Sequence, residues 1–326
     1  MYIQVLGLAQ RESWQQIRAK PGEHGTVRSM LAYRHAFHAG NHADVLKHAT
    51  LVAVLRHMNQ KDKAWRLVDT HAGAGSYGLN APQAQKLAEH YMGVGALWKA
   101  KALPPLLADY VAQVRQANAE HEQGAHGTPG AAGALAVYPG SPRLTRQLMR
   151  PHDQLRLYEL HPTDHALLSH AFEGDDQVDV HKADGFAGIK AQLPPSSRRG
   201  VLLIDPSYEI KTDYQQVVVA CREALTRFAE GVVLVWHPEL SLREATQLAA
   251  RLKAVANAQA KKGWLHAKLT VAPPNAQGFG MLGSAMFVIN PPHTLRSAMA
   301  VALPVLADKL GQFDGAKWQL DVSHGL

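Results

Sequence analysis

The chain has 326 residues, 46% of them hydrophobic, which is enough for one large globular domain with an insertion or for two domains. No window approaches the roughly 18 consecutive apolar residues of a membrane span, and the single cysteine, Cys221, excludes an internal disulfide and a cysteine-based zinc site. A net charge of +7 favours a polyanionic partner, and the cysteine usage predicts a reducing, cytoplasmic setting.

The first part of the chain lacks clear organisation. Residues 1–29 combine prolines, glycines and scattered charge without periodicity, so we predict a dispensable N-terminal extension followed by one folded domain over 30–326. The first predicted helix covers 43–58, where apolar residues recur at helical spacing. Asn41 is its predicted N-cap, and Asp44, three positions later, would complete a loose capping box.

A short apolar strand is predicted over 66–69, and a turn of small residues follows at 72–75. Such a turn lets the backbone approach a nucleoside closely, although a sharp strand-to-helix turn explains it nearly as well. Region 81–118 is helical in pattern, and 120–134 is rich in glycine and alanine. We therefore predict a small helical insertion at about 81–135 that ends in a flexible connection.

Strands and helices alternate through the rest of the chain. This pattern predicts an α/β fold with a doubly wound, mostly parallel sheet, in which ligands bind beyond the carboxyl ends of the strands. The predicted helices cover 162–172, 214–228 and 240–256, and the predicted strands cover 155–160, 178–181, 200–204, 231–236 and, as the last two of the chain, 265–271 and 285–290.

Acidic residues follow four of the predicted strands: Asp69, Glu159, Asp184 and Asp205. The carboxyl ends of parallel strands share one edge of a sheet, so we expect these carboxylates to surround one site. Glu159 suits the hydroxyls of a ribose, although a solvated glutamate at a strand end is an equally good explanation of that residue by itself. The pyrophosphate fingerprint G-x-G-x-x-G is absent from 72–75, which argues against a dinucleotide cofactor.

The segment Asp205-Pro206-Ser207-Tyr208 directly follows a buried strand and is the strongest signal in the sequence. Enzymes that methylate amino groups carry the motif D/N-P-P-Y/F/W at the end of the corresponding strand. An adenine amine is a poor nucleophile, and a carboxylate with a neighbouring backbone carbonyl can accept both of its N–H bonds. Tyr208 offers a face for a flipped-out base. A carboxylate with an ordinary Asp pKa near 3.9 is too weak a base to deprotonate the amine. Asp205 is therefore expected to accept a hydrogen bond from the amine and to position it.

A histidine-rich, aromatic-bearing segment, 33–48, precedes and enters the first predicted helix. Its four histidines, His35, His38, His42 and His48, share no consistent helical face and have no cysteine beside them, so we expect no metal site. The segment fits contacts to nucleic acid and to a ligand carboxylate better. For any one of these histidines, packing or surface exposure remains the simpler explanation.

Tyr138-Pro139-Gly140-Ser141-Pro142 precedes another predicted helix. Ser141 is its predicted N-cap, with Pro142 at the first helical position. This structural role is sufficient to explain the serine, and its hydroxyl or backbone could also face a cofactor.

Together these motifs resemble one family, the bacterial large-subunit (23S) rRNA adenine-N6 methyltransferases of the J type. The resemblance runs in order from residue 30 to about 320 and leaves residues 1–29 outside. It is carried by Tyr33-Arg34-His35, 37–48, 69–75, 138–142, Glu159-Leu160-His161-Pro162, 182–186, Leu203-Ile204-Asp205-Pro206 and Ile289-Asn290-Pro291-Pro292.

The resemblance implies a Rossmann-like class I methyltransferase fold that uses S-adenosylmethionine and acts, as a monomer without metal, on protein-free 23S rRNA. Asp205 would be catalytic, and Tyr33, His35, Pro206 and Tyr208 would contact the substrate. Two departures are Ser207, where the usual motif has proline, and His237, where the family usually has tyrosine. The residues implied for the cofactor are Lys47, His48, His71, Ser141, Glu159, Asp184, Gly185 and Asp205.

Three alternatives stay open at this point. A DNA adenine or protein glutamine methyltransferase would use a related D/N-P-P-Y motif, and the basic N-terminal segment favours nucleic acid over protein. A nucleotide-dependent oxidoreductase could have the same fold, but the pyrophosphate fingerprint is missing. An RNA-binding protein with a vestigial methyltransferase fold would not need the acidic strand ends.

Overall fold

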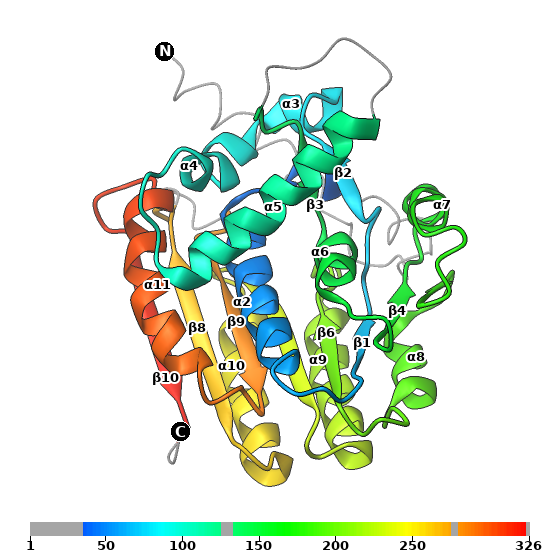
Figure 1. The fold of residues 1–326 in the computed structure, drawn as a ribbon. Coiled ribbons are helices and arrows are strands. Elements are labelled where there is room, and N and C mark those ends of the chain that lie inside the picture. The colour runs from blue at the N-terminus through cyan, green and yellow to red at the C-terminus, as the bar shows by residue number, and fades with distance from the viewer. Residues whose placement is uncertain (1–34, 125–132, 275–279, 324–326) are drawn as a thin grey trace, which may run out of the picture.

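The computed structural model describes residues 35–124, 133–274 and 280–323. Its centre is an eight-stranded sheet in the order β10-β8-β9-β7-β6-β1-β4-β5 (Figure 1). The predicted α/β architecture is therefore confirmed. The strands of this sheet are β1 Arg66–Asp69, β4 Gln154–Tyr158, β5 Val178–His181, β6 Gly200–Ile204, β7 Val232–Glu239, β8 Trp264–Thr270, β9 Gly283–Ile289 and β10 Lys317–Val322.

The sheet is mixed but mostly parallel. Strands β5, β4, β1, β6 and β7 pair in parallel, whereas β9 lies antiparallel between β7 and β8. Strand β10 pairs antiparallel with β8 at the edge. The carboxyl ends of the five parallel strands thus share one edge, and β9 ends at the opposite edge.

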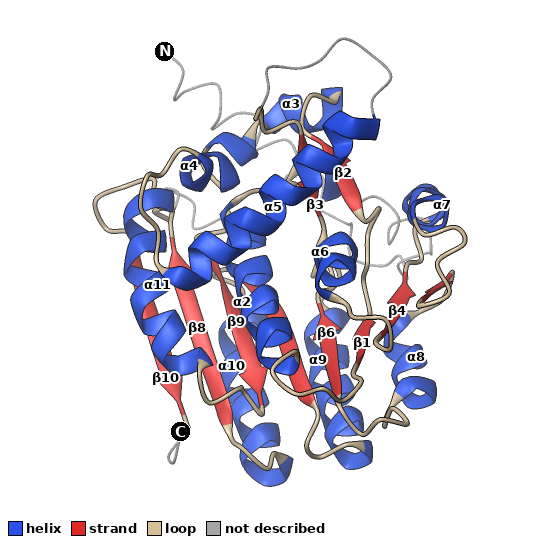
Figure 2. Ribbon diagram, in the orientation of Figure 1, coloured by secondary structure: helices blue, strands red, loops and turns tan. Residues whose placement is uncertain are grey.

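Helices cover both faces of the sheet (Figure 2). One face packs under α2, α6 and α11, with α5 lying against α2 and α11, and the other face packs under α8, α9 and α10. Successive strand residues divide between the two cores: Leu203 points to the first, and Leu202 and Ile204 to the second. The bounds are α2 His42–Met58, α5 Pro105–Gly124, α6 Ser141–Leu148, α7 Pro162–Ala171, α8 Gly185–Gln192, α9 Thr212–Arg227, α10 Arg243–Gln259 and α11 Leu295–Leu310.

Helix α2 is largely buried, and its buried residues include the polar side chains of Asp44, Lys47 and His48. Its N-cap is Asn41 as predicted, because the Asn41 side chain accepts from the backbone N–H groups of Ala43 and Asp44. The predicted capping box is wrong: the Asp44 carboxylate accepts from the N–H of Gly40, one residue earlier. Asp44 is thereby aimed into the protein.

The region predicted as a helical insertion begins and ends beside two short strands that were not predicted. Strands β2 (Ser76–Gly78) and β3 (Val137–Pro139) pair antiparallel in a separate small sheet. Between them lie α3 (Pro82–Leu87), α4 (Val94–Trp98), the single turn η2 (Glu89–Tyr91) and α5. Helix α5 extends to Gly124, into the predicted flexible connection. The assignment of this region as an insertion within one domain stays a prediction.

The end of the chain departs from prediction. Helix α11 was not predicted, and β9 is not the last strand, because β10 follows it. Strand β10 lies at the sheet edge with its residues exposed or half-buried, so its sequence lacks the apolar run that marks a buried strand. Within the described ranges, no helix is long and apolar enough to cross a membrane.

Candidate active site

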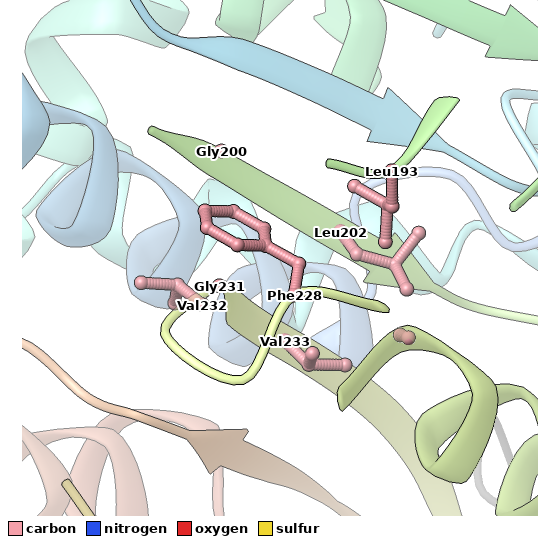
Figure 3. Close-up of a pocket in the computed structure, with 8 residues that line it drawn as sticks. Leu193, Gly200, Leu202, Phe228, Gly231, Val232 and Val233 are labelled. Atoms are coloured by element: carbon pink, nitrogen blue, oxygen red, sulfur yellow. The ribbon is translucent and has the colours of Figure 1, made fainter. Parts of the chain in front are cut away.

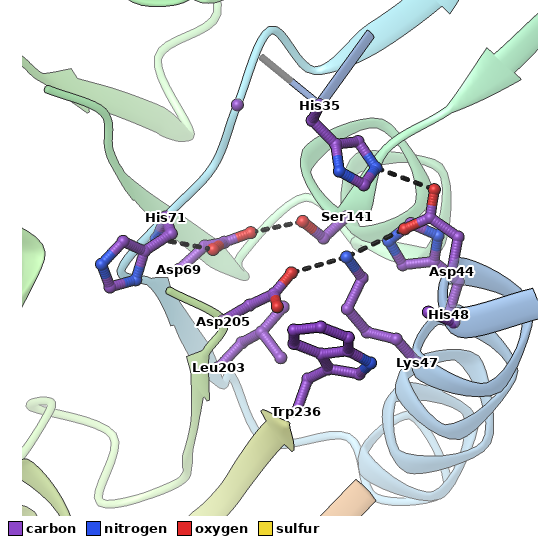
Figure 4. A network of polar contacts seen from close by, with 12 residues as sticks. His35, Asp44, Lys47, His48, Asp69, His71, Ser141, Leu203, Asp205 and Trp236 are labelled. Atoms are coloured by element: carbon purple, nitrogen blue, oxygen red, sulfur yellow. Dashed lines mark hydrogen bonds and ion pairs between the residues drawn. The ribbon is translucent and has the colours of Figure 1, made fainter. Parts of the chain in front are cut away.

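Asp69 and Asp205 lie at the carboxyl ends of neighbouring parallel strands. Strand β1 ends at Asp69, which is in register with Leu203 of β6, and Asp205 follows two residues later. Figure 4 shows both carboxyl groups within one polar network that also includes residues of α2 and α6. The acidic residues after β1 and β6 therefore lie at one edge of the sheet, as expected.

Lys47 connects helix α2 to this edge. Its ammonium Nζ lies 2.5 Å from Asp205 Oδ2 and 2.9 Å from Asp44 Oδ1 (Figure 4). Burial by itself would lower the pKa of Lys47, but the two carboxylates outweigh it and hold this pKa well above its usual value. Burial raises the pKa of Asp205, and the Lys47 ammonium opposes that rise. Lys47 therefore helps to keep Asp205 ionised.

Asp44 is a second buried node of the same network. Burial favours its neutral form, but His35 and Lys47 prevail and hold the pKa of Asp44 well below its usual value. His35 Nε2 lies 2.8 Å from Asp44 Oδ2, and the N–H of Gly40 donates to the same oxygen. The histidine-rich segment thus contacts the network at the carboxyl edge of the sheet through Asp44. Tyr33, the expected substrate contact, lies outside the described residues.

Asp69 joins two further residues expected at the cofactor. Its side chain is fully buried, and it accepts from the Ser141 hydroxyl at 2.6 Å and from the N–H of His71 at 3.2 Å. Ser141 is not an N-cap: the cap is Gly140, and Ser141 is the first residue of α6, where its hydroxyl can point to Asp69. Burial raises the pKa of Asp69 to about 6, and the Ser141 hydrogen bond opposes this rise.

This raised pKa predicts how pH changes stability. The folded state holds the Asp69 proton more tightly than the unfolded chain, so the free energy of unfolding should fall as pH rises from about 4 to about 6. A difference of about two pKa units corresponds to about 3 kcal/mol. Asp69→Asn stays neutral and should therefore gain that amount relative to the unsubstituted protein over this range. Urea unfolding of both proteins between pH 4 and 8 measures the gain; a difference independent of pH would contradict it.

Glu159 follows β4 and holds the turn after β1. Its two carboxylate oxygens accept from the N–H of Gly73 at 2.8 Å and from the N–H of His161 at 2.7 Å. Gly73 has a φ of 61°, a left-handed conformation that favours glycine. Burial raises the pKa of Glu159, against these two hydrogen bonds. The carboxylate and the small-residue turn thus form one unit.

Asp184 and Gly185 begin helix α8. The Asp184 side chain is exposed and caps the helix by accepting from the N–H of Phe186. A Cβ on Gly185 would lie 2.0 Å from the carbonyl oxygen of Thr70, so a glycine is required for α8 to approach the end of β1. His71 packs edge-on against Phe186, with ring centroids 5.0 Å apart. The turns after β1 and β5 therefore contact each other.

The loop after Asp205 is fixed by contacts of Tyr208 with neighbouring residues. Pro206 is buried, Tyr208 has a φ of 55°, and the Tyr208 hydroxyl donates to the carbonyl oxygen of Trp236 at 2.7 Å. The Tyr208 ring packs against Tyr214 and Trp236 and is only 5% exposed. A bulky residue in the left-handed region is strained, which is common at functional turns. Little of this ring is open to a base in this conformation, and base stacking by Tyr208 stays a prediction.

A second motif of similar sequence, Asn290-Pro291-Pro292, lies at the other edge of the sheet. Strand β9 runs antiparallel to β7, so its end is remote from Asp205. The Asn290 side chain donates to the carbonyl oxygens of Ala229 and Gly231, and accepts from two backbone N–H groups that follow α10. These four bonds use both N–H donors and both oxygen lone pairs of the side-chain amide. Asn290 therefore joins two loops and has no donor or acceptor left for a substrate.

Neither the apolar pocket in Figure 3 nor a metal cluster accounts for the site. The pocket lies between the start of β6 and the residues around Phe228, is lined by glycine and apolar side chains, and leaves no space for a water molecule. Among the residues described, no three His, Cys, Asp or Glu side chains are arranged to hold a metal ion. His237 stands at the position where the family usually has tyrosine. Its ring stacks on that of His266.

Comparison with known proteins agrees with the motifs. Residues 62–322 match the family model described as "Ribosomal RNA large subunit methyltransferase D, RlmJ". The chain belongs to this family. The resemblance to the J type is therefore confirmed, and with it the class I methyltransferase fold.

Two relatives and one solved structure are similar over most of the chain. Ribosomal RNA large subunit methyltransferase J of Escherichia coli is 42% identical over 281 residues, which are 86% of this chain and 94% of the relative. The protein of the same name from Haemophilus influenzae is 39% identical over 292 residues, 90% of this chain and 98% of the relative. The crystal structure of LPL1258 from Legionella pneumophila has a TM-score of 0.77 at 29% identity, covering 88% of this chain and 99% of that one.

Most residues of this network could be predicted from the sequence, but two of them could not. Asp44 was assigned only to a helix cap, and Tyr138 only to a motif that precedes a helix. In the structure Asp44 pairs with Lys47, and the Tyr138 hydroxyl lies 2.7 Å from His48 Nδ1. The spacing of Asp44 and Lys47 on one helix face was a usable signal for the first, since residues three apart are neighbours. No local signal pointed to Tyr138.

Proposed function

We propose that this protein transfers a methyl group from S-adenosylmethionine to the N6 amine of a specific adenine in 23S rRNA, on protein-free RNA, as a cytoplasmic monomer. The observation that carries the proposal is Asp205 in Asp205-Pro206-Ser207-Tyr208, placed beside the small-residue turn at the carboxyl edge of the sheet and paired with Lys47. Family membership supports the same reaction class.

The residues at this edge fit S-adenosylmethionine. The cofactor is a nucleoside with a sulfonium and an amino acid, so its cationic parts suit a site with Asp69, Glu159 and Asp205. Glu159 has oxygen lone pairs left for ribose hydroxyls, because each oxygen has one backbone donor. His48 Nε2 is buried without a partner among the described residues, which leaves a polar atom for the ligand.

The carboxylate of Glu159 also argues against a dinucleotide. The N–H of Gly73 donates to Glu159, whereas a pyrophosphate would need the N–H groups of such a turn for itself. A carboxylate beside the turn would repel that pyrophosphate. This contact favours a cofactor without phosphate, and it weighs against the oxidoreductase alternative.

Asp205 would prepare the adenine amine for reaction. When bound, S-adenosylmethionine supplies an electrophilic methyl group. Asp205 Oδ1 and the backbone carbonyl of Pro206 would accept the two N–H groups, so that the nitrogen lone pair is directed at the methyl carbon. As the new N–C bond forms, the C–S bond of the sulfonium would break and leave a neutral thioether. The nitrogen becomes cationic, the nearby carboxylate would stabilise that charge, and one N–H proton would then be lost to solvent. Lys47 occupies Oδ2 and keeps the carboxylate ionised.

Methyl transfer to purified RNA tests the proposal. We expect tritium from labelled S-adenosylmethionine to enter protein-free 23S rRNA, and digestion with mass spectrometry to recover N6-methyladenine. Assembled large subunits, duplex DNA and a glutamine-containing protein substrate are the comparison substrates. Faster methylation of DNA or protein than of rRNA would favour those alternatives, and a product other than N6-methyladenine would refute the assignment of the target atom.

A further inference from the structure

Six connecting segments lie at the amino ends of the parallel strands, at the edge of the sheet opposite Asp205 (Figure 1). They precede β1, β4, β6, β7 and β8 or follow the antiparallel strand β9, and they cover 59–65, 149–153, 193–199, 228–231, 260–263 and 290–294. Six of their Lys and Arg side chains form no ion pair with a carboxylate among the residues described. With His57 and His293 they are called the basic patch: Lys61, Lys63, Arg198, Arg199, Lys261 and Lys262.

Two arginines fix the segment between α2 and β1. Arg150 donates to the carbonyl oxygens of Lys61 at 2.7 Å and Lys63 at 3.1 Å, and Arg199 also donates to that of Lys63. These bonds hold the backbone and leave the side chains of Lys61 and Lys63 exposed. Arg150 also pairs with the buried carboxylate of Asp153 at 3.0 Å, so its charge is balanced. Two lysines are thus presented to solvent on a fixed segment.

Asn290 and a pair of histidines join the other segments to this one. The Asn290 side chain accepts from the backbone N–H groups of Lys261 at 2.9 Å and Lys262 at 2.8 Å, which fixes the segment between α10 and β8. The ring of His57, at the end of α2, meets that of His293 edge-on, with centroids 5.2 Å apart. The cations of different segments therefore lie on one continuous surface.

His57 lies where these charges converge. Burial lowers the pKa of His57, and the neighbouring His293, Lys262, Arg199 and Lys61 lower it further. These four neighbours come from four different segments, so the packing of the segments concentrates positive charge around one ring. His57 Nδ1 is buried and has no hydrogen-bond partner among the described residues. Like charges held close together repel one another, and a bound anion would relieve that repulsion.

Acidic side chains balance little of this charge. The six segments contain only three acidic residues, and one of these, Asp153, is paired with Arg150. The next segment along the same edge, between α7 and β5, is acidic instead and contains Glu173, Asp175 and Asp176. The positive charge is therefore confined to one part of the edge, and it has a defined boundary.

We propose that the basic patch binds the phosphate backbone of a segment of the substrate RNA that is remote from the target adenine. The proposal rests on the proposed function, because its partner is the RNA named there. Arg199 and Asp205 are six residues apart across β6, which corresponds to about 20 Å of extended chain. An RNA must extend along the protein to reach both positions. Contacts to its phosphates would hold the RNA without selecting a base.

The extent of the patch fits a polynucleotide better than a single phosphate ion. Neighbouring strands lie about 4.8 Å apart, so the four intervals from β8 to β1 span about 19 Å. An RNA can place several phosphates along that distance, and lysine and arginine are the usual partners of phosphate. A membrane-binding surface would combine basic residues with exposed apolar ones. None of the large apolar side chains that are exposed in the described residues lies in the six segments.

The salt dependence of RNA binding tests the patch. In the full-length protein, Lys61→Gln combined with Lys262→Gln should weaken binding of protein-free 23S rRNA by about tenfold at low salt. The slope of the logarithm of the binding constant against the logarithm of the salt concentration should decrease by about 1.5, because each phosphate contact contributes about 0.7 to 0.9. With this RNA as substrate, KM should rise while kcat stays near normal, since Asp205 is untouched.

The matched control removes two exposed lysines at the other end of the sheet. Lys309 lies at the far end of α11, and Lys317 pairs with the last residue of β8. Lys309→Gln combined with Lys317→Gln changes the net charge equally and should leave affinity and salt slope near those of the unsubstituted protein. Thermal melts show whether each variant is folded. Equal losses in both double variants, or no loss in the folded patch variant, would overturn the proposal.

The pKa of His57 gives a direct measure of an anion at the patch. Proton NMR of the histidine rings, with His57→Gln to assign the resonance, should show this pKa rising when RNA binds, because phosphates offset the cations around the ring. Inorganic phosphate at the same phosphate concentration should raise it less. An unchanged pKa of His57 in the RNA complex would overturn the proposal.

Two further outcomes separate the possible partners. Patch-dependent binding of vesicles that contain anionic lipid, with RNA binding unaffected by Lys61→Gln and Lys262→Gln, would overturn the proposal in favour of a membrane partner. Patch-dependent binding of 23S rRNA without methyl transfer to it would support the patch as an RNA-binding surface and refute the proposed function.

Discussion

Asp205→Ala is expected to keep at least part of its affinity for S-adenosylmethionine and to lose turnover by about 10²-fold or more, the size of effect typical for removal of a group that stabilises developing charge. Its carboxylate is the acceptor that the proposed reaction needs, whereas the other groups assigned to the cofactor stay in place. Lys47 keeps a partner in Asp44, with the two charged atoms 2.9 Å apart. The folded protein should therefore survive the substitution.

The matched control is Asn290→Ala, in the other motif with the same pattern. Asn290 joins four backbone groups at the opposite edge of the sheet, so its loss should lower the melting temperature while turnover of the folded protein stays near normal. Calorimetric binding of S-adenosylmethionine together with a tritium-methyl assay measures both variants. Near-normal turnover in Asp205→Ala, or a large loss of turnover in folded Asn290→Ala, would show that the catalytic motif is misassigned.

Lys47→Met is expected to lower turnover at neutral pH by roughly tenfold or more, because loss of an opposite charge beside a carboxylate raises its pKa by about one to three units. Burial already raises the pKa of Asp205, and Lys47 is the largest opposing influence. Without Lys47, a larger share of Asp205 is protonated at neutral pH and no longer accepts from the amine. The sign follows directly: activity should return as pH rises through the new pKa.

The pH profile of turnover separates this explanation from structural damage. Lys47→Arg keeps a positive charge near Asp44 and Asp205, so its profile should stay close to that of the unsubstituted protein. Lys47→Met leaves two buried carboxylates with fewer partners, and thermal melts identify any unfolded fraction. If the loss in Lys47→Met were the same at every pH from 6 to 9, the role of Lys47 in keeping Asp205 ionised would be refuted.

Local sequence predicted the elements that carry the chemistry. Strand β1 ends at Asp69 and β6 is followed directly by Asp205, and α2 has helical periodicity with a correctly predicted cap at Asn41. These features follow from side-chain spacing and from capping, which depend on neighbours along the chain. The shared edge of the acidic strand ends could be predicted too, because parallel strands place their carboxyl ends together.

Exposed and edge elements gave weaker signals. Strand β10 is an exposed edge strand without an apolar run. Helix α11 buries one face at helical spacing, but apolar residues such as Val301 also lie on its exposed face and Pro304 lies inside it, so its sequence shows little contrast between the two faces. The role of Ser141 also could not be read from its neighbours along the chain. Its position before proline predicted a helix cap, but in the structure its hydroxyl donates to the Asp69 carboxylate.

Contacts between distant segments were decided only by the tertiary structure. Lys47 and Asp205 are 158 residues apart, and His48 contacts Tyr138, 90 residues further along the chain. The direction of β9 separates Asn290 from Asp205 although their motifs look alike. By itself, then, the sequence determined the fold class and the family and located the aspartate that we propose as catalytic, because these depend on local pattern. The tertiary structure decided which charges and hydroxyls surround that aspartate, because such partners meet only when the strands and helices pack.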